Sequence, residues 1–197
     1  MPIAGVTALQ GLRDKGGLRS GQRVVVNGAS GGVGTFAVQI AKALGAEVTA
    51  VCSTRNVDQA RALGADRVID YTQEDFTRTA EPCDVLLDIA GNRSWRDCRR
   101  VLAPGGTLVA VGGPKQNRLI GPLGNRLWLK MRSVPGDRRV TLMLAKVTRE
   151  ELEFLGRLLE DGRVTPVVER TYRLAETAQA FDRLGQGHAQ GKLVVAV

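Results

Sequence analysis

The sequence is poor in the residues from which metal clusters, disulfide frameworks and base-stacking surfaces are built. Its 197 residues include one histidine, three cysteines and only 4% aromatic residues. Cys52, Cys83 and Cys98 are odd in number, far apart and outside any CxxC spacing, so they indicate neither a disulfide framework nor a zinc cluster. We therefore expect buried, unreactive thiols and no metal site.

Long apolar runs are also lacking. No stretch approaches the roughly 20 apolar residues that a membrane-spanning helix needs, and the N-terminus has neither the basic start nor the cleavage site of a signal peptide. We expect a cytoplasmic protein without a membrane partner. Apolar residues make up 43% of the chain and charged residues 24%, which is typical of an ordinary folded domain.

The charge is biased to one sign, with 28 Lys and Arg against 20 Asp and Glu and a net charge of +8. Clustered cations would favour a nucleic-acid partner, because they release counterions from phosphates. The arginines are scattered instead, in short pairs such as Arg99-Arg100 and Arg138-Arg139, with few aromatic residues beside them to stack on bases. We therefore expect no nucleic-acid partner.

Short apolar runs alternate with helical periodicity along most of the chain. The pattern predicts strands over 23–28, 46–52, 66–70, 84–91, 106–113 and 138–146, and helices over 33–44, 56–64, 93–102, near Leu123–Met131 and over 148–162. The strands are apolar throughout, which indicates a parallel sheet covered on both faces. Right-handed crossovers make such a sheet doubly wound, so the sequence predicts a Rossmann-type α/β fold. Thr148 and Glu151 fit a capping box at the start of the last of these helices.

The C-terminal part has a different pattern. Apolar runs over 164–174 and 191–197 flank a helix near 175–184 and need not belong to the parallel sheet. We therefore predict a dinucleotide-binding Rossmann domain over 1–162 and a short β/α appendage over 163–197. The valines of the two tail strands would expose an apolar patch unless something covers them, so we expect a homo-oligomer or a separate partner chain.

The first strand-to-helix turn has the spacing of a dinucleotide fingerprint. Ala29, Gly31 and Gly34 match G-x-G-x-x-G with alanine in the first place. Gly31 lets the backbone approach a pyrophosphate, Gly34 permits close helix packing, and the helix N-terminus offers free N–H groups to an anion. The hydroxyl of Ser30 adds a donor. A tight turn without a ligand is the alternative, but the flanking strand and helix favour a nucleotide site.

The end of the second strand carries the residues that distinguish the two nicotinamide cofactors. An NAD site has Asp or Glu there, whereas this chain has Ser53, Thr54 and Arg55, which suit a 2′-phosphate and therefore NADPH. Asp58 is one alternative, as a carboxylate that could bind the ribose of NAD, but it lies further along the chain, within the predicted helix. The alternative is that Arg55 is a solvated surface residue.

Glycines end the fourth and fifth predicted strands. Ligands of open α/β sheets bind at the carboxyl ends of strands, so Gly91, Asn92, Gly112 and Gly113 are candidates to flank the nicotinamide. Ordinary turns have the same composition. For Asp88, which precedes them, we favour the role of a turn former.

Several of these segments together resemble a known family. "NGASGGVGTFAVQIAKALGAEVTAVCS", "LGADRVIDY", "LAPGGTLVAVGG" and the closing "GKLVV" are similar to the quinone oxidoreductase (zeta-crystallin-like) branch of the medium-chain dehydrogenase/reductase superfamily. The opening "PIAGVTAL" resembles the helix that leads into that family's cofactor domain. The resemblance implies an NADPH-dependent, zinc-independent reductase of quinones or other α,β-unsaturated carbonyls.

The resemblance also implies roles for single residues. It matches the pyrophosphate loop to Ser30, Gly31, Gly32 and Val33, the 2′-phosphate group to Ser53 and Arg55, an adenosine contact to Tyr71, a cofactor contact to Lys192 and a position near the nicotinamide to Thr7.

Members of the family begin with a separate, mostly β catalytic domain, whereas this chain starts where that domain would end. We therefore expect NADPH binding with an activity that is lost or depends on a partner. The alternative is a non-catalytic NADPH-binding sensor or interaction module. No catalytic residue is assigned, and His188 is interpreted as a surface or packing residue.

Overall fold

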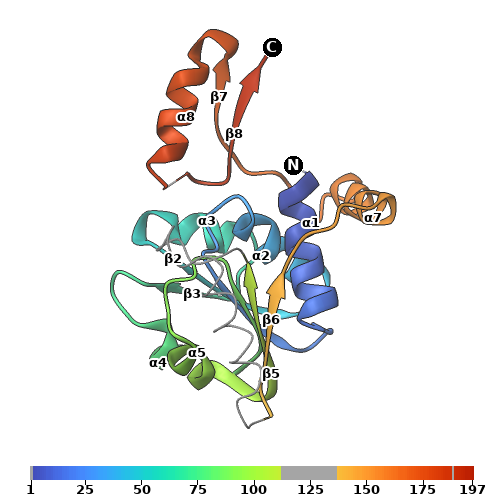
Figure 1. Cartoon of the computed structure of the whole chain (residues 1–197), viewed down its shortest axis with the longest axis vertical. Coiled ribbons are helices and arrows are strands. Elements are labelled where there is room, and N and C mark those ends of the chain that lie inside the picture. The colour runs from blue at the N-terminus through green and yellow to red at the C-terminus, as the bar shows by residue number, and fades with distance from the viewer. Residues whose placement is uncertain (1, 112–136, 188) are drawn as a thin grey trace, which may run out of the picture.

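The computed structural model describes residues 2–111, 137–187 and 189–197, and a six-stranded parallel sheet forms its main body (Figure 1). The strands are β1 (Arg23–Asn27), β2 (Glu47–Cys52), β3 (Arg67–Asp70), β4 (Cys83–Asp88), β5 (Leu102–Val111) and β6 (Arg139–Met143). Their order is β3-β2-β1-β4-β5-β6, so the chain winds outward from β1 to β3 and then returns to the other side of β1 with β4. The predicted doubly wound fold is confirmed, including its sixth strand.

Helices follow most strands, as the periodicity predicts. They are α1 (Pro2–Gln10), α2 (Gly34–Ala43), α3 (Val57–Ala62), α4 (Phe76–Thr79), α5 (Trp95–Val101) and α7 (Arg149–Glu160), with single turns η1 (Gly11–Lys15) and η2 (Thr54–Asn56). The short α4 is an addition to the prediction, and β5 begins at Leu102, where the sequence predicts the end of a helix. The predicted helix near Leu123–Met131 lies outside the described residues. None of the described helices is long and apolar enough to cross a membrane.

The inner strands of the main sheet bury side chains on both of its faces. In β1, Val24 and Val26 join the cluster that contains residues of α1, α2 and α7, whereas Val25 points to the opposite cluster, which contains residues of α4 and α5. All three valines are at most 1% exposed. Burial on both sides explains why the strand sequences lack a polar alternation.

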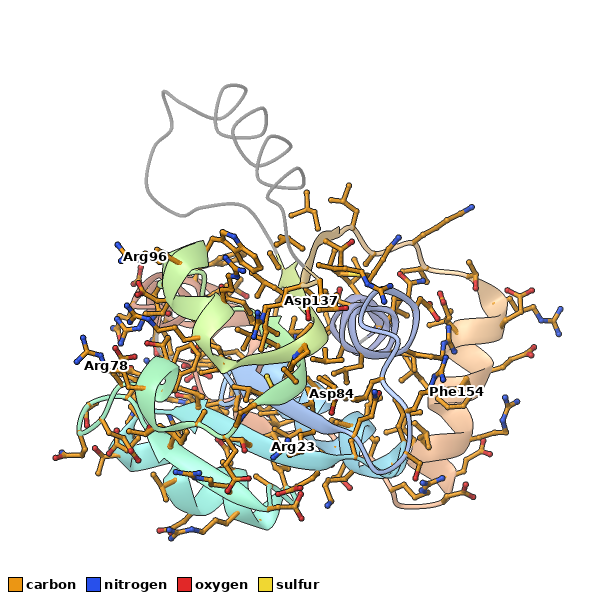
Figure 2. All side chains as sticks on the ribbon, turned by 90° about the horizontal axis from the view of Figure 1, so that it is seen from below. Arg23, Arg78, Asp84, Arg96, Asp137 and Phe154 are labelled. Atoms are coloured by element: carbon orange, nitrogen blue, oxygen red, sulfur yellow. The ribbon has the colours of Figure 1, made fainter. Side chains whose placement is uncertain are left out.

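Helix α7 is attached to α1 by a buried carboxylate. Thr148 occupies the N-cap position of α7, but its side chain makes no capping bond, so the predicted capping box is wrong. Glu151 instead accepts a hydrogen bond from Gln10 Nε2 at 2.5 Å and pairs with Arg13 at 3.3 Å. Phe154 of α7 packs under the same Arg13, 5.8 Å from its guanidinium carbon to the ring centre, on the side facing α1 (Figure 2). Thr148 Oγ1 also donates to Glu151 Oε2, at 3.4 Å, so the long-range partner adds to the local contact.

The C-terminal strands form a sheet of their own. Strand β7 (Val168–Arg173) pairs in parallel with β8 (Lys192–Ala196), and η3 (Leu174–Glu176) and α8 (Thr177–Gly185) connect them. This small sheet stands beyond one end of the main body (Figure 1). The prediction of tail strands outside the main sheet is confirmed.

Replacing Gly34 with alanine should destabilise the fold. A Cβ atom built there would lie 2.6 Å from the carbonyl carbon of Ala29 and would overlap the carbonyl oxygen of Gly28, both of which are backbone atoms. We expect the free energy of unfolding to fall by about 1–3 kcal/mol or more, measured by chemical denaturation. The control is Gly156→Ala within α7, where a Cβ meets nothing within 4 Å. It should raise stability by about 0.5–1 kcal/mol. Equal stability of the Gly34 variant and the parent protein would contradict the packing argument.

Candidate functional site

The glycine turn, defined here as residues 28–34, joins β1 to α2 where the strand order reverses. Gly28 has a φ of +95°, and the N–H of Ala29 donates to the carbonyl of Val51 at the end of β2 (3.0 Å). Helix α2 begins at Gly34 without a side chain that caps its first N–H groups. A Cβ on Gly31 would touch only the carbonyl oxygen of Gly28, at 3.7 Å. The turn is therefore packed against the sheet at Gly34 and open at Gly31, beside uncapped backbone donors.

A buried polar network lies at the carboxyl ends of β1 and β4. Asn27 Nδ2 donates to Asp88 Oδ1 at 2.8 Å and to Asn92 Oδ1 at 3.1 Å. The N–H of Gly91 donates to the same Asp88 oxygen at 3.0 Å, which confirms Asp88 as a turn former. Burial raises the pKa of Asp88, and these two donors act in the opposite direction. The network fixes the turn that carries the exposed Gly91 and Asn92.

The β2 tip, defined here as Ser53–Asn56, lies beside the end of β3. Ser53 Oγ accepts a hydrogen bond from Asn56 Nδ2 at 2.9 Å. Thr54 Oγ1 donates to Asp70 Oδ2 at 2.5 Å, and this bond is the main reason that the pKa of Asp70 is lowered. The hydroxyl of Thr54 is thus engaged with a carboxylate, whereas Arg55 is exposed. Tyr71, which follows Asp70, is 44% exposed.

The C-terminal segment, defined here as Gln190–Lys192, reaches both of these features. The N–H of Gly191 donates to the carbonyl of Ser30 at 2.9 Å, and Gln190 Nε2 donates to Asn56 Oδ1 at 2.5 Å. Lys192 Nζ lies 2.6 Å from the position that a Cβ on Gly32 would take. Burial lowers the pKa of Lys192. The segment therefore joins the glycine turn to the β2 tip.

The structure brings together most of the residues that the sequence predicts. The hydroxyl of Thr7 donates to the carbonyl of Ile3 at 2.6 Å inside α1, and the side chain is largely buried, so its predicted place near a nicotinamide stays a prediction. Gly112, Gly113 and His188 lie outside the described residues. Sequence reasoning missed Asn56 and Gln190. Their contact spans 134 positions and leaves no local signal.

The three cysteines occupy separate buried positions in β2, β4 and α5. Burial raises the pKa of Cys52 to about 11 and the pKa values of Cys83 and Cys98 to about 12, so the thiols stay protonated at neutral pH. Within the described ranges, no group of three or more His, Cys, Asp or Glu residues is placed to hold a metal ion.

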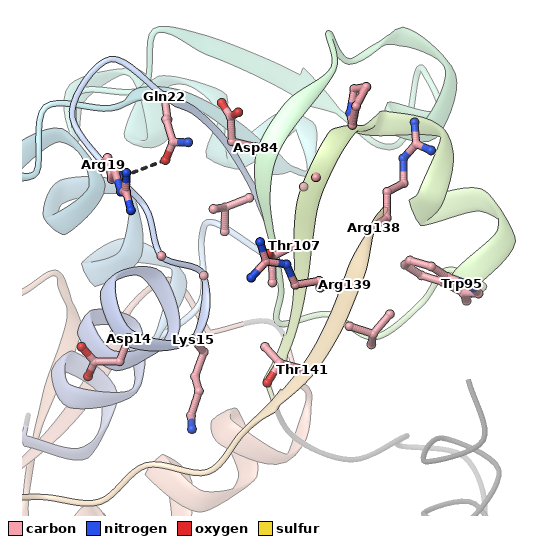
Figure 3. Close-up of a pocket in the computed structure, with 17 residues that line it drawn as sticks. Asp14, Lys15, Arg19, Gln22, Asp84, Trp95, Thr107, Arg138, Arg139 and Thr141 are labelled. Atoms are coloured by element: carbon pink, nitrogen blue, oxygen red, sulfur yellow. Dashed lines mark hydrogen bonds between the residues drawn. The ribbon is translucent and has the colours of Figure 1, made fainter. Parts of the chain in front are cut away.

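A polar hollow of about 720 Å³ lies at the opposite edge of the main sheet, near the amino ends of β4, β5 and β6 (Figure 3). Arg19 and Gln22 come from the segment that precedes β1, and Arg139 and Thr141 come from β6. The glycine turn, in contrast, follows the carboxyl end of β1. The hollow is therefore separate from the candidate site.

Comparison with known proteins identifies the family. A family model described as zinc-binding dehydrogenase matches residues 63–195. A chloroplast envelope quinone oxidoreductase homolog of Arabidopsis thaliana is 32% identical, with 99% of this chain and 60% of the relative covered. A mitochondrial NAD(P)H oxidoreductase of Mus musculus is 34% identical, with 100% of this chain and 54% of the relative covered.

Solved structures give the same result. The quinone oxidoreductase from Coxiella burnetii has a TM-score of 0.83 at 32% identity, covering 100% of this chain and 59% of that one. An NAD-dependent alcohol dehydrogenase has a TM-score of 0.82 at 26% identity, covering 100% and 57%. The chain spans between half and two thirds of the length of these relatives. It belongs to the zinc-binding dehydrogenase family of the medium-chain dehydrogenase/reductase superfamily and resembles the quinone oxidoreductases within it.

Proposed function

We propose that the chain binds NADPH and forms the cofactor-binding part of a reductase that transfers hydride to a quinone or another α,β-unsaturated carbonyl. The observation that carries the proposal is the convergence of the glycine turn, the β2 tip and the C-terminal segment at the edge where the strand order reverses. Ligands of open α/β sheets bind at this edge. Relatives named quinone oxidoreductase and NAD(P)H oxidoreductase support the reaction class.

The glycine turn fits a pyrophosphate. The open side of Gly31 leaves room for phosphate oxygens, and the uncapped first turn of α2 offers N–H donors and a partial positive charge. Lys192 Nζ beside Gly32 adds a full positive charge. We assign this subsite to the turn residues that the sequence predicts, namely Ser30, Gly31, Gly32 and Val33, and to Lys192.

The β2 tip fits a 2′-phosphate through Ser53 and Arg55. The hydroxyl of Thr54 is less suited, because it donates to Asp70. Asp70 at the end of β3 is a carboxylate that could repel a phosphate here, but it accepts hydrogen bonds from the hydroxyls of Thr54 and Thr72 at 2.5 and 2.7 Å. Tyr71, the residue after Asp70, is exposed. We assign it to the adenosine side of the cofactor.

The nicotinamide side is assigned to the turn after β4. Gly91 and Asn92 are exposed there, and the network of Asn27 and Asp88 holds them in place. The contacts of Gly112, Gly113 and Thr7 with the nicotinamide remain predictions from the sequence. Bound NADPH would supply the hydride. The described residues include no group of three or more His, Cys, Asp or Glu that could hold a zinc ion.

A hydride donor and its acceptor must be held about 3–3.5 Å apart in a site that excludes water. Solvent reaches Gly91 and Asn92 in this chain, so we propose that a further domain or subunit completes the substrate site. Apolar side chains are available for such a contact, because Phe181 is 67% exposed and Leu184 is 56% exposed on α8. Self-association is the other arrangement that would cover them. A cytoplasmic location stays a prediction, since relatives carry chloroplast and mitochondrial names.

A second candidate function is a non-catalytic NADPH-binding sensor or interaction module. The exposed nicotinamide side favours it, since binding needs only the phosphate subsites. NADPH turnover with a quinone, measured once the proposed further domain or subunit is present, separates the two functions.

Gly31→Asp should abolish NADPH binding without unfolding the protein. The new Cβ makes one ordinary contact at 3.7 Å, but the carboxylate would occupy the proposed place of the pyrophosphate. We expect affinity to fall at least about tenfold in a fluorescence titration, with an unchanged melting temperature. Gly185→Asp is the control for the added charge, because a Cβ there meets nothing within 4 Å. Normal binding by the Gly31 variant would refute the pyrophosphate assignment.

The parent chain should bind NADPH at least about tenfold more tightly than NADH, a difference of roughly 1.4 kcal/mol, because Arg55 and Ser53 can pair with the 2′-phosphate. Arg55→Ala should reduce this ratio by weakening NADPH alone. Arg61→Ala is the control, since Arg61 is an exposed cation on the nearby α3. The two affinities are measured by calorimetry. A preference for NADH, or an Arg55 variant with an unchanged ratio, would show that the cofactor is misassigned.

The 197-residue chain should associate in light scattering and should reduce menadione far more slowly than about 10 s⁻¹, a typical enzyme turnover. The reasons are the exposed apolar side chains of α8 and the exposed nicotinamide side. Boiled protein is the control for direct reaction of NADPH with the quinone. A stable monomer with ordinary turnover would overturn the proposal that another domain or subunit is needed.

A further inference from the structure

The C-terminal segment contacts the β2 tip through one chain of side-chain amides. Gln190 Nε2 donates to Asn56 Oδ1 at 2.5 Å, and Asn56 Nδ2 donates to Ser53 Oγ at 2.9 Å. Asn56 is only 3% exposed, and these two bonds define which way its amide points. Gln190 of the C-terminal segment is therefore linked, through Asn56, to the hydroxyl of Ser53 at the β2 tip.

The direction of these bonds decides what the Ser53 hydroxyl can do. A serine hydroxyl has one proton to donate and two lone pairs to accept. Because Ser53 Oγ accepts from Asn56, its proton is left to donate to another acceptor. With the amide of Asn56 reversed, Oδ1 would face Ser53 and would take that proton. In the structure Gln190 presents Nε2 to Asn56, so Oδ1 of Asn56 is the acceptor of that bond and Nδ2 is the group that faces Ser53.

Other contacts hold Gln190 in position. Its own N–H donates to Glu169 Oε2 of β7 at 2.6 Å, and Arg183 of α8 pairs with the other oxygen of Glu169 at 2.7 Å. The next residue, Gly191, donates to the carbonyl of Ser30 at 2.9 Å. Although burial alone would raise the pKa of Glu169, the Gln190 N–H, Arg183 and Arg55 lower it, so this carboxylate stays charged near Arg55. The tail strands, α8 and the glycine turn thus all restrain the same side chain.

We propose that Gln190 and Asn56 are positioning residues that select the cofactor with a 2′-phosphate, by keeping the Ser53 hydroxyl as a donor to that phosphate. The inference rests on the proposed binding of NADPH. It assigns a specificity role to the appendage, which makes no part of the main sheet. NADH lacks the 2′-phosphate, so its binding should not depend on the orientation of Asn56.

The test is a double-mutant cycle of Gln190→Ala and Ser53→Ala, with NADPH and NADH affinities measured by calorimetry on the full chain. Gln190→Ala should weaken NADPH binding about three- to tenfold, the range for one hydrogen bond, and should change NADH binding less than about twofold. In the Ser53→Ala background, Gln190→Ala should have no further effect on NADPH, because the hydroxyl through which it acts is gone. Gln179→Ala on the exposed face of α8 is the matched control and should change neither affinity.

Four outcomes of this test bear on the inference and on the proposed function. If Gln190→Ala lowers the affinities for NADPH and NADH equally, Gln190 has a general structural role and the inference is overturned. The inference is also overturned if Gln190→Ala lowers NADPH affinity by the same factor with and without Ser53→Ala. A parent chain that prefers NADPH, with an unaffected Gln190 variant, would refute the inference and leave the proposed function intact. A parent chain that does not prefer NADPH would refute both.

Discussion

The start of α2 lies against the backbone of the turn that precedes it, and the candidate site depends on this contact. Only a residue without a Cβ can occupy position 34, because Ala29 and Gly28 fill the space beside it with backbone atoms. The close approach aims the N-terminus of α2 at the open side of the turn near Gly31. It also places the turn where the C-terminal segment can bond to Ser30. A wider turn would separate the backbone donors from Lys192.

Polar groups at the reversal of strand order support the same arrangement. Asn27 and Asp88 end neighbouring strands, and their hydrogen bond at 2.8 Å is buried. A buried carboxylate without partners would be costly, but Asp88 accepts from both Asn27 and the Gly91 N–H. The hydrogen bond therefore fixes the ends of β1 and β4, from which the two loops leave, relative to each other. An open sheet binds its ligand in this gap.

The sequence predicts the local part of this structure well, because local features have local signals. The spacing of Ala29, Gly31 and Gly34 between a strand and a helix predicts the turn, and apolar strands predict a sheet covered on both faces. Interactions between distant segments were not predictable. Glu151 accepts a hydrogen bond from Gln10 across 141 positions, and Asn56 accepts one from Gln190 across 134 positions. Such contacts exist only once the sheet has formed, so neither periodicity nor motif spacing records them.

Charged side chains lie at both of the proposed phosphate subsites: Lys192 at the glycine turn, and Arg55 with Glu169 at the β2 tip. Burial lowers the pKa of Lys192, which means that removal of water disfavours its ammonium form in the free protein. A phosphate beside Gly32 would favour the ammonium form and thus recover part of that free energy on binding. At the β2 tip, Glu169 lies near Arg55 and is paired with Arg183 at 2.7 Å. In the proposed NADPH complex, the appendage would contribute Lys192 as a cation at the pyrophosphate subsite and Glu169, paired with Arg183, near the 2′-phosphate subsite. Its position on the main body would then be a condition for tight binding of the cofactor.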